Sequence, residues 1–196
     1  MNRNGLPTSL RLNVARVWII ITTIAGLLVL GPSRTTQADA DTPPLSPPQG
    51  TVVLSIQGNV QIASPPDTAP QHSERKVDFD MAMLMALPVT RIETTTPWTK
   101  GLTHFEGVAI KDLLRAVAAT GEISEFTALN DYTVRIPLND FSQFGAIIAY
   151  KVNGKMMGVR DKGPLWVIYP LDAHTQLQNA QYRDRMIWQL RSITVK

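Results

Sequence analysis

From Thr51 to the end of the chain, short hydrophobic runs rich in Val, Ile and Thr alternate with Gly, Pro, Asn and Asp. Runs of this kind favour β-strands, and the residues between them favour turns. In AIIAYKVNGKMMGV, the pair Asn153-Gly154 favours a type I′ hairpin turn. The sequence therefore predicts a domain built largely from short strands with mostly antiparallel connections.

Five further segments have strand character. They are TVVLSIQGNVQI (two strands around Gly58-Asn59), VTRIET (Val89 to Thr94), FTALNDYTVRIPL (two strands around Asn130-Asp131), PLWVIYP and MIWQLRSITV. Between them, a Pro-rich loop is expected from Ala63 to Arg75.

Two helices are predicted. Asp80 can cap a short helix over MAMLMAL, with its Met and Leu side chains inward, and Pro88 ends it. A second is expected in GVAIKDLLRAVAATG, with Gly121 as the residue after its end. Its apolar face would consist of Val108, Leu113, Leu114 and Val117. The expected fold class is mixed α+β, with many strands and a few short helices.

The first forty residues differ from the rest. A basic start precedes an uncharged apolar run from Val17 to Leu30, and Ala38 and Ala40 are small residues before a cut after Ala40. This pattern predicts a general secretory signal peptide over 1–40. An uncleaved anchor is the alternative, although the run is shorter than the ~20 residues of a membrane span. A Pro-rich linker (41–50) and one domain (51–196) follow.

Removal of the signal peptide changes the charge. It carries four of the 19 basic and one of the 16 acidic residues, so 15 of each remain and the mature chain is neutral. A neutral chain without a basic run gives no support for nucleic-acid binding. The prediction is a periplasmic or secreted protein with no nucleic-acid partner and no stable membrane span after cleavage.

Few motifs for chemistry are present. The chain has no cysteine, which excludes disulfides, thiolate metal sites and a cysteine nucleophile. His72, His104 and His174 form no metal-binding motif, and no phosphate-binding loop or G-x-S-x-G elbow occurs. A hydrolase therefore has only generic Ser, His and Asp content behind it. Asp131 and Asp140 are either an acidic pair or turn caps.

Two groups of apolar residues allow a structural and a functional interpretation. The methionines of MAMLMAL could form an adaptable binding face, but helical core is the commoner role. Trp98, Trp166 and Trp188 could line a ligand pocket, but core anchors are again commoner. Neither group establishes a site by itself.

The order of several segments resembles the molybdopterin-binding oxidoreductase domain of the sulfite-oxidase family. These segments are RIETTTPWT, HFEGVAIKDLL, ALNDYTVRIPLND, AIIAYKVNGKMM, KGPLWVIYP and WQLRSITV. The resemblance covers nearly all of Thr51 to Lys196. It implies a mixed α/β fold with a deep pocket for a molybdenum pterin.

The chain departs from that family at three positions. The resemblance implies a cysteine ligand to the metal at about Thr94, where a hydroxyl is a poor substitute for a thiolate. It also implies an asparagine and an arginine near Gly163-Pro164, where this chain has Asp161 and Trp166. An aspartate would repel a phosphate, and a tryptophan offers no bidentate fork.

The route of export gives a further argument against a bound cofactor. Exported enzymes of the family cross the membrane folded, on a twin-arginine signal, whereas Arg11 and Arg16 here are separated by four residues. A general secretory signal carries an unfolded chain, which would arrive without its cofactor.

The expectation is therefore a degenerate, non-catalytic domain without catalytic or metal-binding residues and without an expected cofactor, binding another small ligand or a periplasmic protein. The alternative is an active molybdopterin oxidoreductase with a non-cysteine metal ligand. A hydrolase ranks third. The candidate pocket rim comprises Thr94, Thr95, Thr96, Trp98, Asn130, Tyr132, Arg135, Asp161, Lys162 and Trp166, with Arg135 and Lys162 as the nearest basic groups for an anionic ligand.

Overall fold

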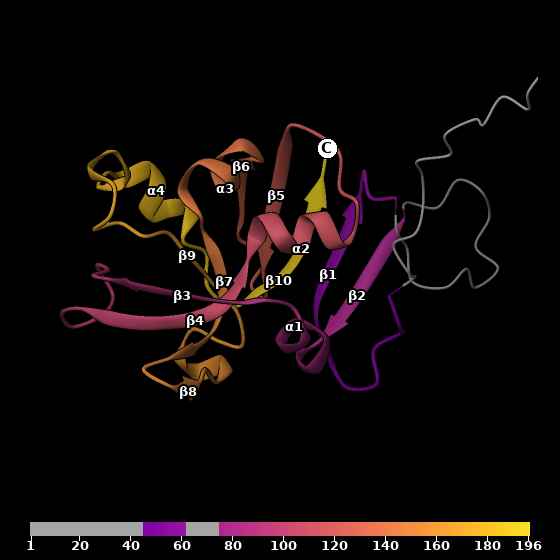
Figure 1. Ribbon diagram of the computed structural model, residues 1–196, viewed down its shortest axis with the longest axis horizontal. Helices are drawn as coiled ribbons and strands as arrows, with labels where there is room; N and C mark the ends of the chain where they lie inside the picture. The colour runs from indigo at the N-terminus through magenta and orange to yellow at the C-terminus, as the bar shows by residue number, and fades with distance from the viewer. Residues whose placement is uncertain (1–44, 62–74) are drawn as a thin grey trace, which may run out of the picture. The chain divides into compact units, whose positions relative to one another are not determined.

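The computed structural model describes residues 45–61 and 75–196, which contain two five-stranded sheets (Figure 1). The first has the order β2 (Lys76–Asp80), β1 (Val52–Gly58), β10 (Leu190–Val195), β5 (Ile123–Ala128) and β6 (Thr133–Pro137). The second has the order β3 (Val89–Thr94), β4 (Thr103–Ala109), β7 (Ile147–Val152) and β8 (Lys155–Met156), with β9 (Trp166–Ile168) also paired to β7. The predicted mixed, strand-rich fold is confirmed.

The strand pairing is antiparallel everywhere in these sheets except between β1 and β10, the first and last described strands. In that parallel pair Ser55 lies opposite Ser192 and Ile56 opposite Ile193. The sequence pattern predicts strands but not their partners, so this long-range pair could not be read from it.

The helix α1 (Met81–Ala86) begins where the sequence predicts. The Asp80 carboxylate accepts a hydrogen bond from the Met83 N–H at 2.8 Å. This bond and one from the Gly50 N–H hold the pKa of Asp80 below its usual value. The expected inward face is smaller than predicted, because Leu84 is buried but Met85 is 43% exposed.

The second expected helix is shorter than predicted. β4 continues through Val108 to Ala109, and α2 then covers only Ile110–Ala116. Val108 therefore belongs to a strand, and the prediction that it shares the helical face is wrong. Gly121 is not the residue after the helix either, because Ala118 takes the left-handed conformation there, with φ of 46°. β-branched Val108 favours the strand, and pairing with β7 stabilises it.

Four short elements follow in regions where the sequence gives no clear helical signal. They are α3 (Asn139–Phe144), α4 (Ala180–Arg185) and the 3₁₀ turns η1 (Val159–Asp161) and η2 (Thr175–Leu177). Asn179 caps α4 by accepting from the Tyr182 N–H at 3.3 Å. One turn and a half is too short for a hydrophobic periodicity to show.

Two predicted turns are confirmed and one strand is not. Asn153 and Gly154 have φ of 48° and 79°, as a type I′ hairpin requires. The turn at Asn130-Asp131 joins β5 and β6 as expected. After Gly58, only an isolated bridge from Val60 to Ala119 stands where a second short strand was expected.

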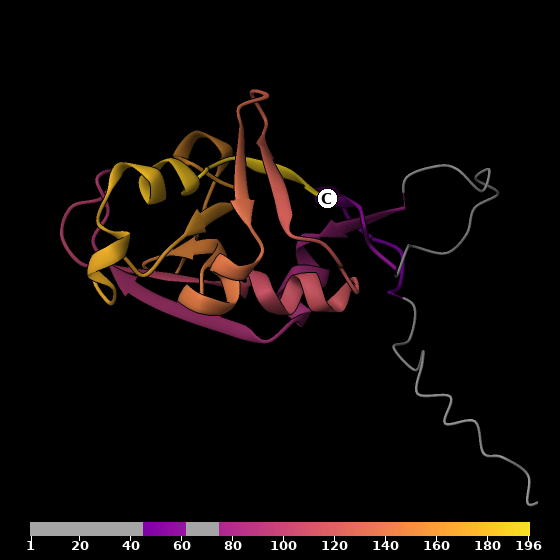
Figure 2. The ribbon, with the colours of Figure 1, turned by 90° about the horizontal axis from the view of Figure 1, so that it is seen from above.

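Residues of both sheets and of the helices α1, α2 and α3 contribute to one hydrophobic core. Figure 2 shows these elements from above. α2 runs along one side of the first sheet, and the β5–β6 hairpin projects beyond it. The largest fully buried side chains are Trp166, Tyr150, Tyr169, Phe79, Phe105, Phe126 and Phe141. The rings of Phe105 and Trp166 pack edge to face, with their centroids 5.5 Å apart.

Some sequence predictions lie outside the described residues. They are the signal peptide, the first part of the linker, most of the Pro-rich loop and His72. In the described ranges, none of the helices has the length and apolar character needed to cross a membrane.

Candidate functional site

The end of β3 is closed by contacts within the protein. Thr94 is fully buried, and its hydroxyl accepts a hydrogen bond from the Asp172 N–H at 3.1 Å. The same hydroxyl donates to the Thr95 carbonyl at 3.3 Å. The bond accepted from Asp172 ties the end of β3 to the segment after β9, and the donated bond goes to the neighbouring residue.

The carboxylate of Asp172 completes this tie. It accepts from the Thr95 N–H at 2.6 Å and from the Thr95 hydroxyl at 2.8 Å. The backbone bond, then the hydroxyl bond, lowers the pKa of Asp172 from its usual value. We call these three residues, Thr94, Thr95 and Asp172, the strand-end clamp.

The turn after the clamp positions Trp98. The Thr96 hydroxyl pairs with that of Thr99 at 2.9 Å and accepts from the Trp98 N–H at 3.2 Å. Thr96 is buried, whereas Trp98 is only half-buried. The threonines thus fix the backbone from which the indole of Trp98 extends.

Three tryptophans meet beside this turn. The ring centroid of Trp98 lies 6.0 Å from that of Trp166 and 5.3 Å from that of Trp188, and both pairs pack edge to face. Trp166 is buried and donates its indole N–H to the Met186 carbonyl at 2.9 Å, so it is a core residue. Trp98 and Trp188 are half-buried and face a cavity.

The cavity has a volume of about 280 Å³. Its lining comes from the turn after β3, the tip of the β5–β6 hairpin, and the end of α4 with the residues after it. The lining residues are Trp98, Ala128, Asn130, Tyr132, Arg183, Asp184, Met186, Ile187 and Trp188. The cavity is largely apolar, with a few polar groups at the rim.

A buried ionic group holds α4 against the rest of the domain. Asp140 of α3 pairs with Arg185 of α4 and accepts from the Tyr169 hydroxyl at 3.1 Å. Burial, and then the negative charge of Asp140, raises the pKa of Tyr169. The guanidinium of Arg185 also lies 4.9 Å from the ring centroid of Tyr182. The acidic pair considered from the sequence, Asp131 with Asp140, is thus divided, because Asp131 pairs with Arg191.

The structure brings some of the predicted rim residues together. Trp98, Asn130 and Tyr132 line the cavity, and Trp166 lies beneath Trp98. Thr95 and Thr96 line a second, shallow hollow with Pro97, Leu171, Asp172, Gln178 and Arg183. Thr94 lines neither of these two hollows, because it is buried in the clamp.

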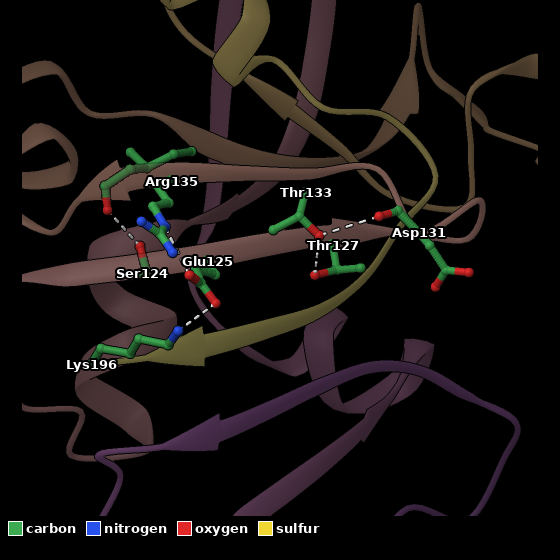
Figure 3. Close-up of polar contacts among 8 residues, drawn as sticks. Ser124, Glu125, Thr127, Asp131, Thr133, Arg135 and Lys196 are labelled. Carbon is green, nitrogen blue, oxygen red and sulfur yellow. Dashed lines mark hydrogen bonds and ion pairs between the residues drawn. The ribbon is translucent and has the colours of Figure 1, made fainter.

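The other predicted rim residues lie apart or behind the aromatic group. The Lys162 ammonium is 5.7 Å and 5.6 Å from the ring centroids of Trp166 and Trp188. Asp161 is exposed in η1. Arg135 lies on β6 and donates to Glu125 at 2.8 Å, next to the ion pair of Lys196 with the same carboxylate (Figure 3). Arg135 is therefore engaged elsewhere on the sheet.

Sequence reasoning missed Arg183. Among the described residues that line the two hollows, it is the only basic one, and it belongs to both. The segment LDAHTQLQNAQYRD shows no motif that would single it out. Only the folded position of α4 brings Arg183 next to the turn after β3.

The donor set at the end of β3 does not fit a molybdenum pterin. The hydroxyl of Thr94 is a poor ligand for molybdenum and is already bonded to the protein. The Asp172 carboxylate beside it would repel an anionic cofactor. Within residues 45–61 and 75–196, no cluster of three or more His, Asp or Glu side chains could hold a metal ion.

Comparisons with known proteins agree on one fold. The family model described as the oxidoreductase molybdopterin binding domain matches residues 72–175, just over half of the chain. The structure is similar to the crystal structure of the sulfane dehydrogenase SoxCD from Paracoccus pantotrophus, with a TM-score of 0.52 and 14% sequence identity. The match covers 72% of this chain and 37% of that one, so this chain spans little more than a third of its length. No curated protein matches the chain.

Proposed function

Because the chain belongs to the family of oxidoreductase molybdopterin-binding domains, of the sulfite-oxidase type, we propose that it is a non-catalytic member. Its pocket takes another small ligand or a protein partner in place of the pterin cofactor. Members of the family normally bind molybdopterin, and this chain keeps their fold.

The strand-end clamp carries the proposal. The resemblance to the family implies a cysteine thiolate at about Thr94. A thiolate is soft and readily deprotonated, whereas a threonine hydroxyl is neither. Here the hydroxyl of Thr94 holds the Asp172 N–H instead of pointing into a cavity. The side chain at this position therefore serves the fold.

The charges around the site support the same proposal. The Asp172 carboxylate adjoins the end of β3, and Arg183 is the only basic residue among the described residues that line the two hollows at this site. A pterin phosphate is held by several donors, and Arg is the usual one. Trp166, at the place where the resemblance implies an arginine, is committed to the core through its bond to Met186.

Export by the general secretory route forms the second part of the proposal. The basic start, the apolar run and the small residues before position 40 support it. A chain that crosses the membrane unfolded would fold outside the cytoplasm, away from cofactor insertion. The protein would then act in the periplasm or outside the cell.

Metal analysis of the full chain tests the proposal. The wild type and a Thr94→Cys variant are produced in bacteria that make molybdenum cofactor, and the protein is recovered from each cell fraction. A cytoplasmic sulfite-oxidase-like enzyme from the same cells is the positive control. We expect wild-type protein in the periplasm or medium with molybdenum far below one atom per chain. The Thr94→Cys variant should also bind no molybdenum, because the Asp172 carboxylate still accepts hydrogen bonds from Thr95 beside it.

The opposite result would establish the alternative, an active molybdopterin oxidoreductase with a hydroxyl ligand. It would consist of stoichiometric molybdenum in the wild type, together with a dye-linked reductase activity that Thr94→Ala abolishes. Protein found only in the cytoplasm would contradict the export part and leave the metal result to be judged separately.

A further inference from the structure

We propose that the cavity between Trp98 and Trp188 binds a small planar aromatic carboxylate, with its ring against the two indoles and its carboxylate on Arg183. The inference rests on the proposed function, since it assigns a ligand to a pocket that the pterin does not fill.

The shape of the cavity favours a flat ring. Trp98 and Trp188 meet at an interplanar angle of 76°, so their faces form two walls of a corner. Met186 and Ile187 add apolar surface next to this corner. Aromatic rings pack well in offset or edge-to-face contact with such walls. At about 280 Å³, the cavity suits a ligand of roughly one or two rings.

The polar groups at the rim of the cavity favour a ligand whose ring carries a hydrogen-bond acceptor. Among the described residues, the guanidinium of Arg183 and the indole N–H groups of Trp98 and Trp188 have no hydrogen-bond acceptor, unlike that of Trp166. The side-chain amide oxygen (Oδ1) of Asn130 accepts from the Tyr132 N–H at 3.2 Å, which leaves the side-chain N–H groups of Asn130 as donors. Asp184 is the one carboxylate in the lining. Donors therefore exceed acceptors, and a carboxylate would satisfy them.

The charge behind the indoles argues against a cationic ligand. The Lys162 ammonium lies 5.6 Å from the ring centroid of Trp188 and 5.7 Å from that of Trp166. These rings already face a cation, and a second one close by would be repelled by it. Asp184 acts in the opposite direction, but Arg183 beside it is also exposed, so solvent screens these two opposite charges alike and the half-buried Lys162 leaves the surroundings positive. The balance therefore selects an anionic aromatic compound over a cationic one.

Calorimetric titration of the full chain with three probes of one shape tests the inference. The probes are naphthoate, naphthylmethanol and naphthylmethylammonium, which carry a negative, a neutral and a positive substituent. We expect naphthoate to bind most tightly and the ammonium least. Arg183→Gln should weaken naphthoate about tenfold and leave naphthylmethanol unchanged, as loss of one charge-assisted contact predicts.

Two further variants make the test specific. Arg135→Gln removes another exposed arginine, which pairs with Glu125 away from the cavity, so naphthoate binding should not change. Trp188→Leu should weaken naphthoate and naphthylmethanol alike, provided that circular dichroism shows a folded chain. Because Arg183 is exposed, the Arg183→Gln variant is expected to fold. It therefore decides the test even if Trp188→Leu does not fold.

Three outcomes would overturn the inference: no binding of naphthoate, tighter binding of the ammonium probe, or an Arg183→Gln variant that binds naphthoate like the wild type. The proposed function fails on a different measurement, the molybdenum content. A metal-free chain that ignores naphthoate would thus refute the ligand class alone.

Discussion

The two sides of the candidate site differ in how they use their polar groups. On the β3 side, the hydroxyls of Thr94, Thr95 and Thr96 all have partners within the protein. On the α4 side, among the described residues, the guanidinium of Arg183 and the indole N–H of Trp188 have none. Satisfied groups hold a fold together, whereas free donors around an apolar cavity are available to a ligand. The three threonines are therefore assigned to the fold, and Arg183 with the indoles of Trp98 and Trp188 to binding.

The open side depends on rigid support from behind. Arg185 follows the cavity residues Arg183 and Asp184 directly, and its guanidinium is buried against Asp140. The Tyr169 hydroxyl satisfies another lone pair of that carboxylate. A buried ion pair of this kind need not raise stability over an apolar core, but losing one partner leaves a buried charge uncompensated. The cavity wall should therefore be sensitive to Asp140.

The largest effect is expected from Asp140→Ala. It leaves the Arg185 charge buried without its partner and should lower the free energy of unfolding by about 3–5 kcal/mol. Urea denaturation followed by tryptophan fluorescence measures the loss. Hydrogen exchange should show faster opening at residues 180–188 than at residues 89–96, because the clamp does not depend on Asp140.

Tyr169→Phe is the matched control for Asp140→Ala. It removes one neutral donor to the same carboxylate and keeps the ion pair, so a loss of about 1 kcal/mol is expected. Equal acceleration of exchange on both sides of the site in Asp140→Ala would show that they open as one unit, and the comparison would fail.

Thr94→Val should have an intermediate effect. Valine keeps the shape of the buried side chain but leaves the Asp172 N–H without its acceptor, at a cost of about 1–3 kcal/mol. Naphthoate affinity should stay unchanged, because the clamp is assigned to structure. Chemical denaturation and calorimetric titration measure the two quantities.

Thr127→Val serves as the reference for Thr94→Val. The Thr127 hydroxyl pairs with that of Thr133 at 3.0 Å on the solvent-accessible β5–β6 hairpin (Figure 3), so its loss should cost within about 0.5 kcal/mol. If Thr94→Val were no worse than Thr127→Val, the clamp would have no structural role and the division of the site would need revision.

Much of the fold was predictable because its signals are local. The β-branched run Val89 to Thr94, the Asn153-Gly154 turn and the Asp80 cap each act through neighbouring residues, and each is confirmed. The assignment of Val108 to a helix failed because pairing with β7 extends β4 beyond the point where the helical pattern begins. Tertiary contacts override a local pattern in such cases.

The candidate site was less predictable, because most of its geometry depends on tertiary contacts. Trp98, Asn130 and Tyr132 line one cavity, because strand ends and hairpin tips of one scaffold often converge. Arg183 sits on a helix of six residues that gives no periodic signal, and its role follows from where the buried pair of Arg185 places that helix. Asp172 likewise gains its partners only from the fold.

The smallest expected effect is the pH dependence of the clamp. Hydrogen bonds from Thr95 lower the pKa of Asp172 in the folded chain, so its contribution to stability is fully present above the unfolded value of about 4. It is lost as the pH falls through the lower folded value. Because Asp172 is exposed, the contribution should not exceed about 1 kcal/mol.

The difference in stability between wild type and Asp172→Asn isolates that contribution, since Asp80, Glu106 and Glu125 also have lowered pKa values and affect both proteins alike. Urea denaturation at a series of pH values should show that the difference in free energy of unfolding between the two proteins is present at neutral pH and becomes smaller in acid. A difference that stays constant with pH would mean that the Asp172 charge adds nothing to the clamp. The closed side of the site would then rest on the Thr94 hydroxyl and on packing.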